Sequence, residues 1–142
     1  MSQFTQPCAA GVSGFVVAVV GASGAVGVEL VRCLEQRHFP VSELKLFASA
    51  RSAGNTLSFR GRSLRIEELD EQSFRGVDLA LFSAGSAISK RYAPLAARQG
   101  TLVIDNSSAF RMDPTVPLVI PSVRPVGPLV SSTVSSTELA PV

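Results

Sequence analysis

The chain has 142 residues, of which 46% are hydrophobic and 17% charged, so it is too apolar for a disordered protein and long enough for one domain with its own core. The net charge of +2 is too small, and the basic residues too scattered, to indicate nucleic acid or a membrane surface as a partner. The two cysteines, Cys8 and Cys33, cannot form a disulfide framework or a zinc site, and Cys33, which flanks the apolar stripe of a helix, is interpreted as part of the core.

The N-terminal segment carries no sign of a targeting signal. Its first basic residue is Arg32, and no apolar run is long enough to span a bilayer. We therefore expect a cytoplasmic protein. Residues 1–14 are small and polar, and we interpret them as a flexible leader.

The first apolar run, Phe15–Val20, is rich in β-branched residues and predicts a parallel strand that is covered on both faces. After it the period changes, because Gly27, Leu30, Val31 and Leu34 recur at helical spacing. We expect this helix to end near His38, ahead of Pro40.

Between this strand and helix lie three glycines with the spacing G-x-x-G-x-x-G. A strand that turns on glycines into a helix presents free backbone N–H groups and a positive dipole end, which suits a dinucleotide pyrophosphate. We expect Gly21 to allow the tight turn, Gly24 to admit phosphate and Gly27 to allow close packing. A purely structural turn without a ligand is the alternative. The candidate cofactor-binding residues here are Gly21, Ala22, Ser23, Gly24, Ala25, Val26 and Gly27.

Downstream, apolar segments alternate with polar and helical ones. Pro94 is expected to kink its helix or to delay the start of that helix. This alternation predicts an α/β protein with a Rossmann-like, doubly wound and mostly parallel sheet. The expected elements are strands at 44–48, 78–82 and 101–105, a hairpin of 56–60 with 63–67, a helical turn at 69–76, a helix at 89–98 and an edge strand at 116–120.

In such sheets, ligands bind beyond the carboxyl ends of the strands. Those ends carry small or hydrogen-bonding residues, as a shared rim around one extended ligand requires. Besides the glycine turn they include Ser49–Ser52, Ser83, Ala84, Gly85, and Asp105–Ser108 with Asn106.

The turn after the second strand indicates which coenzyme binds. An NAD site usually has an acidic residue there that binds the ribose 2′-hydroxyl, whereas this chain has Arg51 and Ser52. Arginine offers a cationic fork that suits phosphate, so we predict NADP. A surface arginine in a turn is the alternative.

Arg111, in the loop after the fourth core strand, could bind a phosphate or carboxylate or be merely solvated.

Five blocks of the sequence, in order, resemble the aspartate-β-semialdehyde dehydrogenase family. The family reduces β-aspartyl phosphate with NADPH in lysine, methionine and threonine biosynthesis. The resemblance implies that the glycine turn holds the pyrophosphate, that Arg51 and Ser52 hold the 2′-phosphate, that Ser83–Gly85 line the groove, and that Arg111 binds the substrate phosphate. The blocks lie within Val16–Gly27, Phe47–Gly54, Asp78–Gly85, Val103–Arg111 and Val116–Pro121.

The sequence departs from the family after Pro121. The family continues to a nucleophilic cysteine, whereas here Ser122–Val142 is rich in Ser, Thr and Pro and contains no cysteine. We therefore expect an NADP-binding domain at 15–121, an atypical tail at 122–142, and no catalytic residue in the chain. Neither Cys8 nor Cys33 is placed to attack an acyl phosphate.

Three hypotheses remain. We favour the NADP-binding half of an aspartate-semialdehyde dehydrogenase, inactive alone and prone to associate through an exposed interdomain face, for example as a homo-oligomer. A stand-alone NADP-binding or regulatory module is the second. The third is a domain like that of N-acetylglutamyl-phosphate reductase or of a short-chain enzyme. The short-chain reading is disfavoured because Tyr92, the only tyrosine, is followed four residues later by Ala96 rather than lysine.

Overall fold

The computed structural model describes residues 14–119, so the predicted leader (apart from Gly14) and the predicted tail lie outside the described residues. Within this range, two helices and six strands follow one another. In order they are β1 (Phe15–Val20), α1 (Ala25–Gln36), β2 (Val41–Ala48), β3 (Thr56–Phe59), β4 (Arg62–Glu68), β5 (Leu79–Phe82), α2 (Ser86–Arg98) and β6 (Leu102–Asp105).

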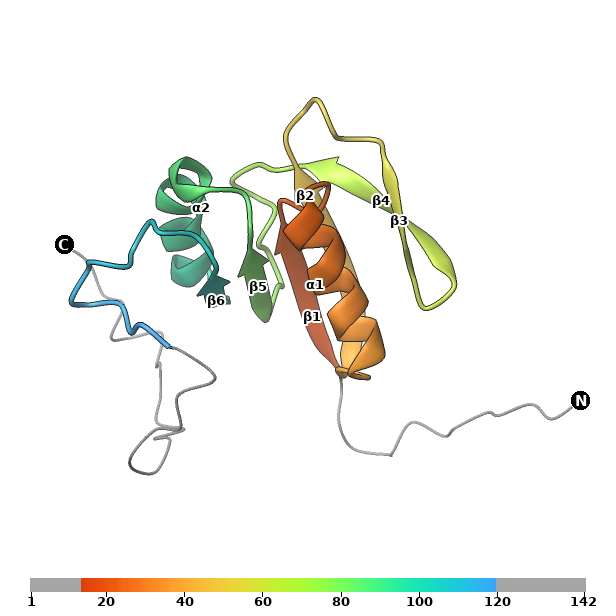
Figure 1. The fold of residues 1–142 in the computed structure, drawn as a ribbon, viewed down its shortest axis with the longest axis horizontal. Helices are drawn as coiled ribbons and strands as arrows, with labels where there is room; N and C mark the ends of the chain where they lie inside the picture. The colour runs from red at the N-terminus through yellow and green to blue at the C-terminus, as the bar shows by residue number, and fades with distance from the viewer. Residues whose placement is uncertain (1–13, 120–142) are drawn as a thin grey trace, which may run out of the picture.

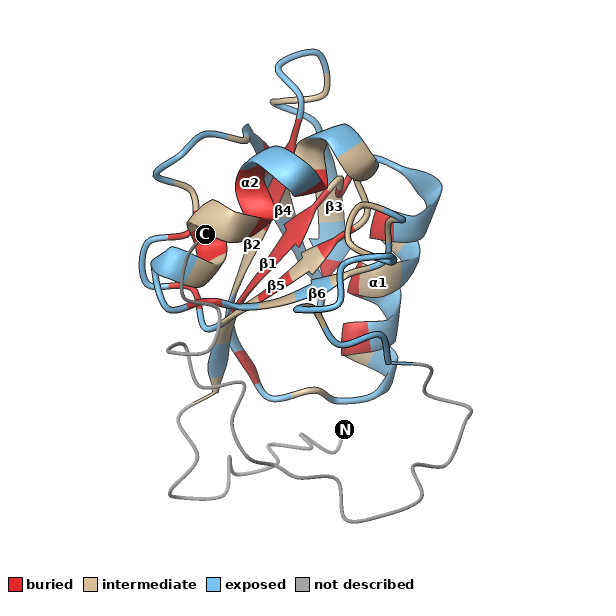
Figure 2. Ribbon diagram, turned by 90° about the vertical axis from the view of Figure 1, so that its left-hand side faces the viewer, coloured by how far each residue is buried: buried red, intermediate tan, exposed pale blue. Residues whose placement is uncertain are grey.

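The strands form one sheet in the order β3-β4-β2-β1-β5-β6 (Figure 1). All neighbours pair in parallel except β3, which pairs antiparallel with β4. The two helices cover opposite faces of the sheet (Figure 2). This arrangement confirms the predicted doubly wound α/β fold. The strand order reverses at β1, and that is where such sheets open a crevice for a ligand.

Strand β1 explains the apolar run that precedes the glycines. Val17 and Val19 belong to the core layer under α1, whereas Ala18 and Val20 belong to the layer under α2. All four are fully buried, because the strand is covered on both faces (Figure 2). In the second layer the rings of Phe74 and Phe82 stack with centroids 5.7 Å apart.

The hairpin is confirmed, with Thr56 opposite Arg65 and Phe59 opposite Arg62. Its turn is Arg60-Gly61, both at positive φ (49° and 73°), as a tight hairpin turn requires. Strand β2 is longer than expected and begins at Val41, because Phe15 pairs with Val41 at the start of β1 although Ser42 and Glu43 are polar.

Helix α2 begins at Ser86, three residues earlier than expected. The prediction that Pro94 delays the start of this helix is therefore wrong. Gly85, at a φ of 88°, turns the chain directly from β5 into the helix. Pro94 lies inside the helix, which continues to Arg98. Neither helix in the described range is long and apolar enough to cross a membrane.

Three further expectations are corrected. The expected helical turn at 69–76 is present only as successive turns over 71–76, with Phe74 as their buried anchor. The expected edge strand at 116–120 is wrong over 116–119, which pair with no strand, and residue 120 lies outside the described range. Cys33 is exposed on α1, with its sulfur 4.0 Å from a carboxylate oxygen of Glu29, and is not part of the core.

Candidate functional site

The turn after β1 packs closely between the ends of β2 and β5. The N–H groups of Gly21 and Ala22 both donate to the carbonyl oxygen of Phe47 in β2, at 2.8 and 3.0 Å. Gly21 has a φ of 86°, and a Cβ at this position would lie 2.9 Å from the backbone of Ser83 after β5. Only glycine satisfies both the backbone conformation and the available space.

Gly27 brings helix α1 directly onto this turn. A Cβ on Gly27 would lie 2.1 Å from the carbonyl oxygen of Gly21 and 2.8 Å from Cα of Ala22. Gly24 differs, because its φ of −80° suits any residue and its Cβ would be 3.4 Å from the Gly21 oxygen. The fold therefore requires Gly21 and Gly27, whereas Gly24 is exposed and leaves open space outside the turn.

The first turn of α1 offers unused hydrogen-bond donors. The N–H groups of Ser23, Ala25, Val26 and Gly27 donate to no acceptor in the described part of the chain. The first turn holds no acidic residue, and no side chain caps it. A phosphate group fits here, because it can accept hydrogen bonds from the free amides and is attracted by the positive end of the helix dipole.

The ends of β5 and β6 complete the rim at the same edge of the sheet. Ser83 donates from both its N–H and its hydroxyl to the Val20 carbonyl, at 2.9 and 3.2 Å. Ala84 is half-buried and Gly85 is exposed beside the start of α2. The Asn106 N–H extends the β5–β6 ladder to the Phe82 carbonyl (3.0 Å), and its side chain is exposed. The structure thus places the glycine turn, Ser83–Gly85 and Asn106 at the carboxyl edge of the sheet, where a doubly wound sheet has its ligand-binding crevice.

The two candidate arginines lie in exposed loops. Arg51 is in the turn that follows β2, where the Ser52 N–H donates to the Ser49 carbonyl at 2.9 Å and Ser52 is half-buried. Arg111 lies in the loop after β6. Within residues 14–119, neither guanidinium forms an ion pair, so both are free to bind an anion.

Sequence reasoning missed Ser89. This hydroxyl is fully buried in α2 and donates to Asp105 at the end of β6, with Oγ and Oδ1 3.0 Å apart. Its sequence signal is a polar residue that shares the buried stripe of α2 with Tyr92, Ala93 and Ala96.

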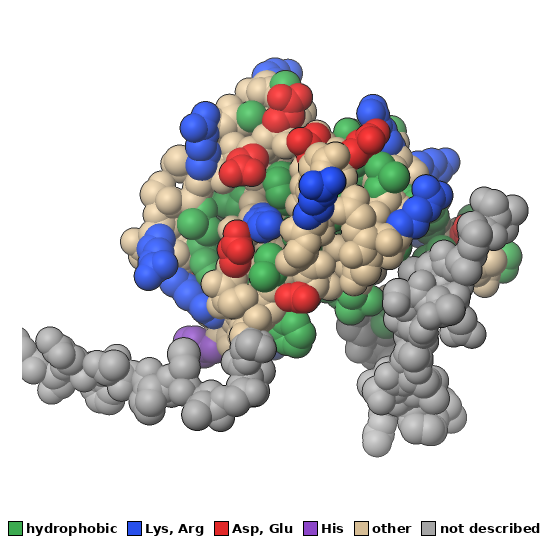
Figure 3. All heavy atoms as spheres, turned by 180° about the vertical axis from the view of Figure 1, so that it is seen from behind, with side chains coloured by type: hydrophobic (Ala, Val, Ile, Leu, Met, Phe, Trp, Pro, Cys, Tyr) green, Lys and Arg blue, Asp and Glu red, His purple; other side chains and the backbone are tan. Residues whose placement is uncertain are grey.

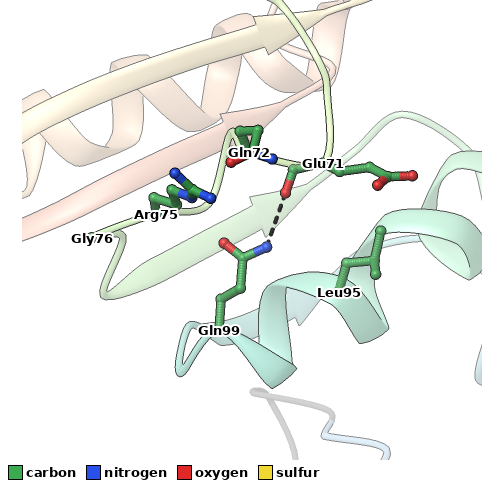
Figure 4. Close-up of a pocket in the computed structure, with 6 residues that line it drawn as sticks. All are labelled: Glu71, Gln72, Arg75, Gly76, Leu95 and Gln99. Carbon is green, nitrogen blue, oxygen red and sulfur yellow. Dashed lines mark hydrogen bonds between the residues drawn. The ribbon is translucent and has the colours of Figure 1, made fainter.

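A hollow at the opposite edge of the sheet is separate from this crevice. It lies between the turns before β5 and the C-terminal end of α2, where Gln99 donates to the Glu71 carbonyl at 2.9 Å (Figure 4). Its walls are mostly solvent-exposed side chains, and no pair of acid and base or nucleophile and base meets there. The lining residues are Glu71, Gln72, Arg75, Gly76, Leu95 and Gln99.

The face of the molecule opposite α1 carries acidic and basic side chains side by side (Figure 3). No patch of a single sign gathers on that face, in agreement with the small net charge.

The fold, the glycine turn and the free amides define a dinucleotide-binding domain of the Rossmann class. The chain belongs to the semialdehyde dehydrogenase family, whose NAD-binding domain it matches over residues 16–126. A nicotinamide dinucleotide is therefore its cofactor.

Individual relatives agree with this family. The chain is 55% identical to the aspartate-semialdehyde dehydrogenase of Aquifex aeolicus over 113 residues, which cover 79% of this chain and 33% of that protein. The crystal structure of aspartate semialdehyde dehydrogenase II from Vibrio cholerae matches with a TM-score of 0.74 and 48% identity, over 76% of this chain and 32% of that one. The Candida albicans enzyme, solved with NADP, shares the fold at a TM-score of 0.63 and 23% identity, over 75% of this chain and 33% of that one. The chain spans about a third of the length of its curated relatives.

Proposed function

We propose that this chain is the NADP-binding part of an aspartate-semialdehyde dehydrogenase, which reduces β-aspartyl phosphate to the semialdehyde. The observation that carries this proposal is the glycine turn, where Gly27 packs on Gly21 and the amides of residues 25–27 stay free at the point where the strand order reverses. Relatives that are 55% and 51% identical to this chain are named as that enzyme.

NADP rather than NAD is supported by the turn after β2. Arg51 is exposed and unpaired there among the described residues, Ser52 lies beside it, and no acidic residue occupies positions 49–54. A guanidinium favours a phosphate over a hydroxyl, because it has donors and charge but no acceptor. The relative from Candida albicans was solved with NADP.

The coenzyme, when bound, supplies hydride to the acyl group. The residues of this chain bind and orient it: amides of the first turn of α1 hold the pyrophosphate, Arg51 and Ser52 hold the 2′-phosphate, and Ser83–Gly85 with Asn106 line the groove. Arg111 binds the phosphate of the substrate. Cys33 lies in the third turn of α1, away from the strand ends where the acyl group would be bound, so we do not propose it as the thiolate that forms the thioester.

We also propose that copies of the chain associate through the outer part of the sheet. Leu102 and Ile104 on the edge strand β6 are 48% and 54% exposed. They lie next to Leu79 and Leu81 of β5 in the parallel register, so the apolar side chains form one patch, the β6 patch. Apolar patches on sheet edges promote association. We expect such a biosynthetic enzyme to be cytoplasmic.

Calorimetric titration of the chain with NADP, and with NAD as the control, tests this function. Binding of NADP with little or no heat from NAD is the expected result. Turnover is expected only when a polypeptide that supplies the nucleophilic cysteine is added. Absence of binding by either coenzyme would contradict the proposal.

A further inference from the structure

The carboxylate of Asp105, at the end of β6, connects two elements that flank the crevice. Its Oδ1 accepts hydrogen bonds from the Ser89 hydroxyl in α2 (3.0 Å) and from the Ser107 N–H (2.8 Å). Its Oδ2 accepts a bond from the Ser107 hydroxyl at 2.8 Å. One side chain therefore holds both the first turns of α2 and the loop after β6.

Further side-chain bonds extend this connection along the loop. The Ala109 N–H donates to the Ser107 hydroxyl at 3.0 Å, and the hydroxyls of Ser86 and Ser108 lie 3.0 Å apart. Such local bonds replace a strand ladder as the means of ordering a loop. The loop that leads to Arg111 is thus attached to α2 by hydroxyls and to β6 by Asp105.

We propose that Asp105 is a positioning residue for the dinucleotide and substrate site, an inference that rests on the proposed function. It sets the placement of the 106–111 loop relative to the first turns of α2. Asn106 and Arg111 are carried by that loop, while Ser83–Gly85 lead into the helix. Asp105 acts through Ser89 and Ser107 and does not need to touch the ligand.

Packing elsewhere keeps the fold independent of these bonds. Strands β5 and β6 are joined by a parallel ladder that runs from Leu79–Leu102 to Phe82–Asp105. Helix α2 is held on the sheet by buried Tyr92, Ala93 and Ala96. Removing the Asp105 bonds should therefore loosen the loop without detaching the helix or the strand.

Removing the charge of Asp105 distinguishes a positioning role from a direct electrostatic effect on NADP binding. A carboxylate near a polyanionic ligand repels it, so neutralising the charge would by itself strengthen binding. If Asp105 positions the loop, the nearly isosteric Asp105→Asn variant binds NADP more weakly, because its amide nitrogen cannot accept the Ser107 hydroxyl proton. The two effects have opposite signs.

The experiment compares Asp105→Asn and Ser89→Ala with Thr101→Val. Thr101 is a matched control because it directly precedes β6, the strand that ends at Asp105. Its buried hydroxyl donates to the Val77 carbonyl at 2.9 Å, away from the 106–111 loop. We expect NADP affinity to fall about tenfold in Asp105→Asn, a loss typical of a charged hydrogen bond. It should fall several-fold in Ser89→Ala and stay unchanged in Thr101→Val.

Amide hydrogen exchange supplies a readout without ligand. The Ser107 and Ala109 amides should exchange faster in Asp105→Asn and at the wild-type rate in Thr101→Val. Unchanged exchange, or an equal or tighter NADP affinity in Asp105→Asn, would overturn the proposal. If the wild-type chain binds no dinucleotide, the proposed function fails with the positioning role, and exchange still decides whether Asp105 orders the loop.

Discussion

The Cα of Gly27 lies so close to Gly21 that a Cβ there would sit 2.1 Å from the Gly21 carbonyl oxygen. This contact joins the first turn of α1 to the end of β1 and places the free amides over the crevice. The stability of the domain, and with it the proposed binding site, therefore depends on the absence of a Cβ at position 27.

We expect Gly27→Ala to lower the free energy of unfolding by about 1–3 kcal/mol, because the backbone must move to admit the methyl group. Denaturation in urea measures the change. Gly24→Ser is the control, since its Cβ would be 3.4 Å from the Gly21 oxygen and serine is a good N-cap. It should leave stability unchanged but weaken NADP binding. Equal losses of stability in the two variants would contradict this reading of the turn.

Arg51→Ala should weaken NADP binding about tenfold or more and leave NAD binding unchanged, because we propose that the guanidinium binds only the 2′-phosphate, which NAD lacks. Titration with both coenzymes measures the effect. Arg62→Ala, at the hairpin, removes a comparable exposed arginine away from the crevice and should change neither affinity. An equal loss of NAD and NADP affinity in Arg51→Ala would show that the side chain supports the loop instead of selecting the coenzyme.

The double variant Leu102→Ser, Ile104→Glu should reduce self-association, because it removes half of the β6 patch and adds a charge to an edge strand. Sedimentation over a range of protein concentrations measures the association. Met112→Ser is the matched control, since Met112 is 91% exposed but lies in the loop, away from β6. If the double variant associates as strongly as the wild type, a different surface is responsible.

Asp113 gives the free energy of unfolding a small pH dependence. The Thr115 hydroxyl and then the Thr115 N–H donate to its carboxylate and lower its pKa. The carboxylate therefore stabilises the folded state above the pKa of the unfolded chain, and this stabilisation is lost as the pH falls through the lower folded pKa. Thr115→Val should raise the pKa of Asp113 toward its ordinary value in an NMR titration. A pKa that does not move would exclude the hydroxyl as the main cause.

Much of the fold followed from pattern alone. The run Phe15–Val20 and the change to helical spacing after Gly21 predicted β1 and α1, because a strand buried on both faces and a helix buried on one face have different periods. The hairpin was equally clear from its alternation around Gly61. The predicted range of β2 is too short because Ser42 and Glu43 are exposed, so no apolar pattern marks them. The strand is held there by pairing with β1 instead of by burial. The start of α2 was missed because Gly85 replaces the usual side-chain cap.

The sequence by itself determined the class of the domain, the glycine turn and the residues at the ends of the strands, because these depend on local period and on backbone freedom. Only the tertiary structure decided that Gly27 packs on Gly21 while Gly24 stays open, that Cys33 is exposed, and that Ser89 meets Asp105 across sixteen residues of chain. Those relationships join residues that are neighbours in space but not in any periodic pattern, and they arise when the sheet brings the ends of β1, β5 and β6 to one edge.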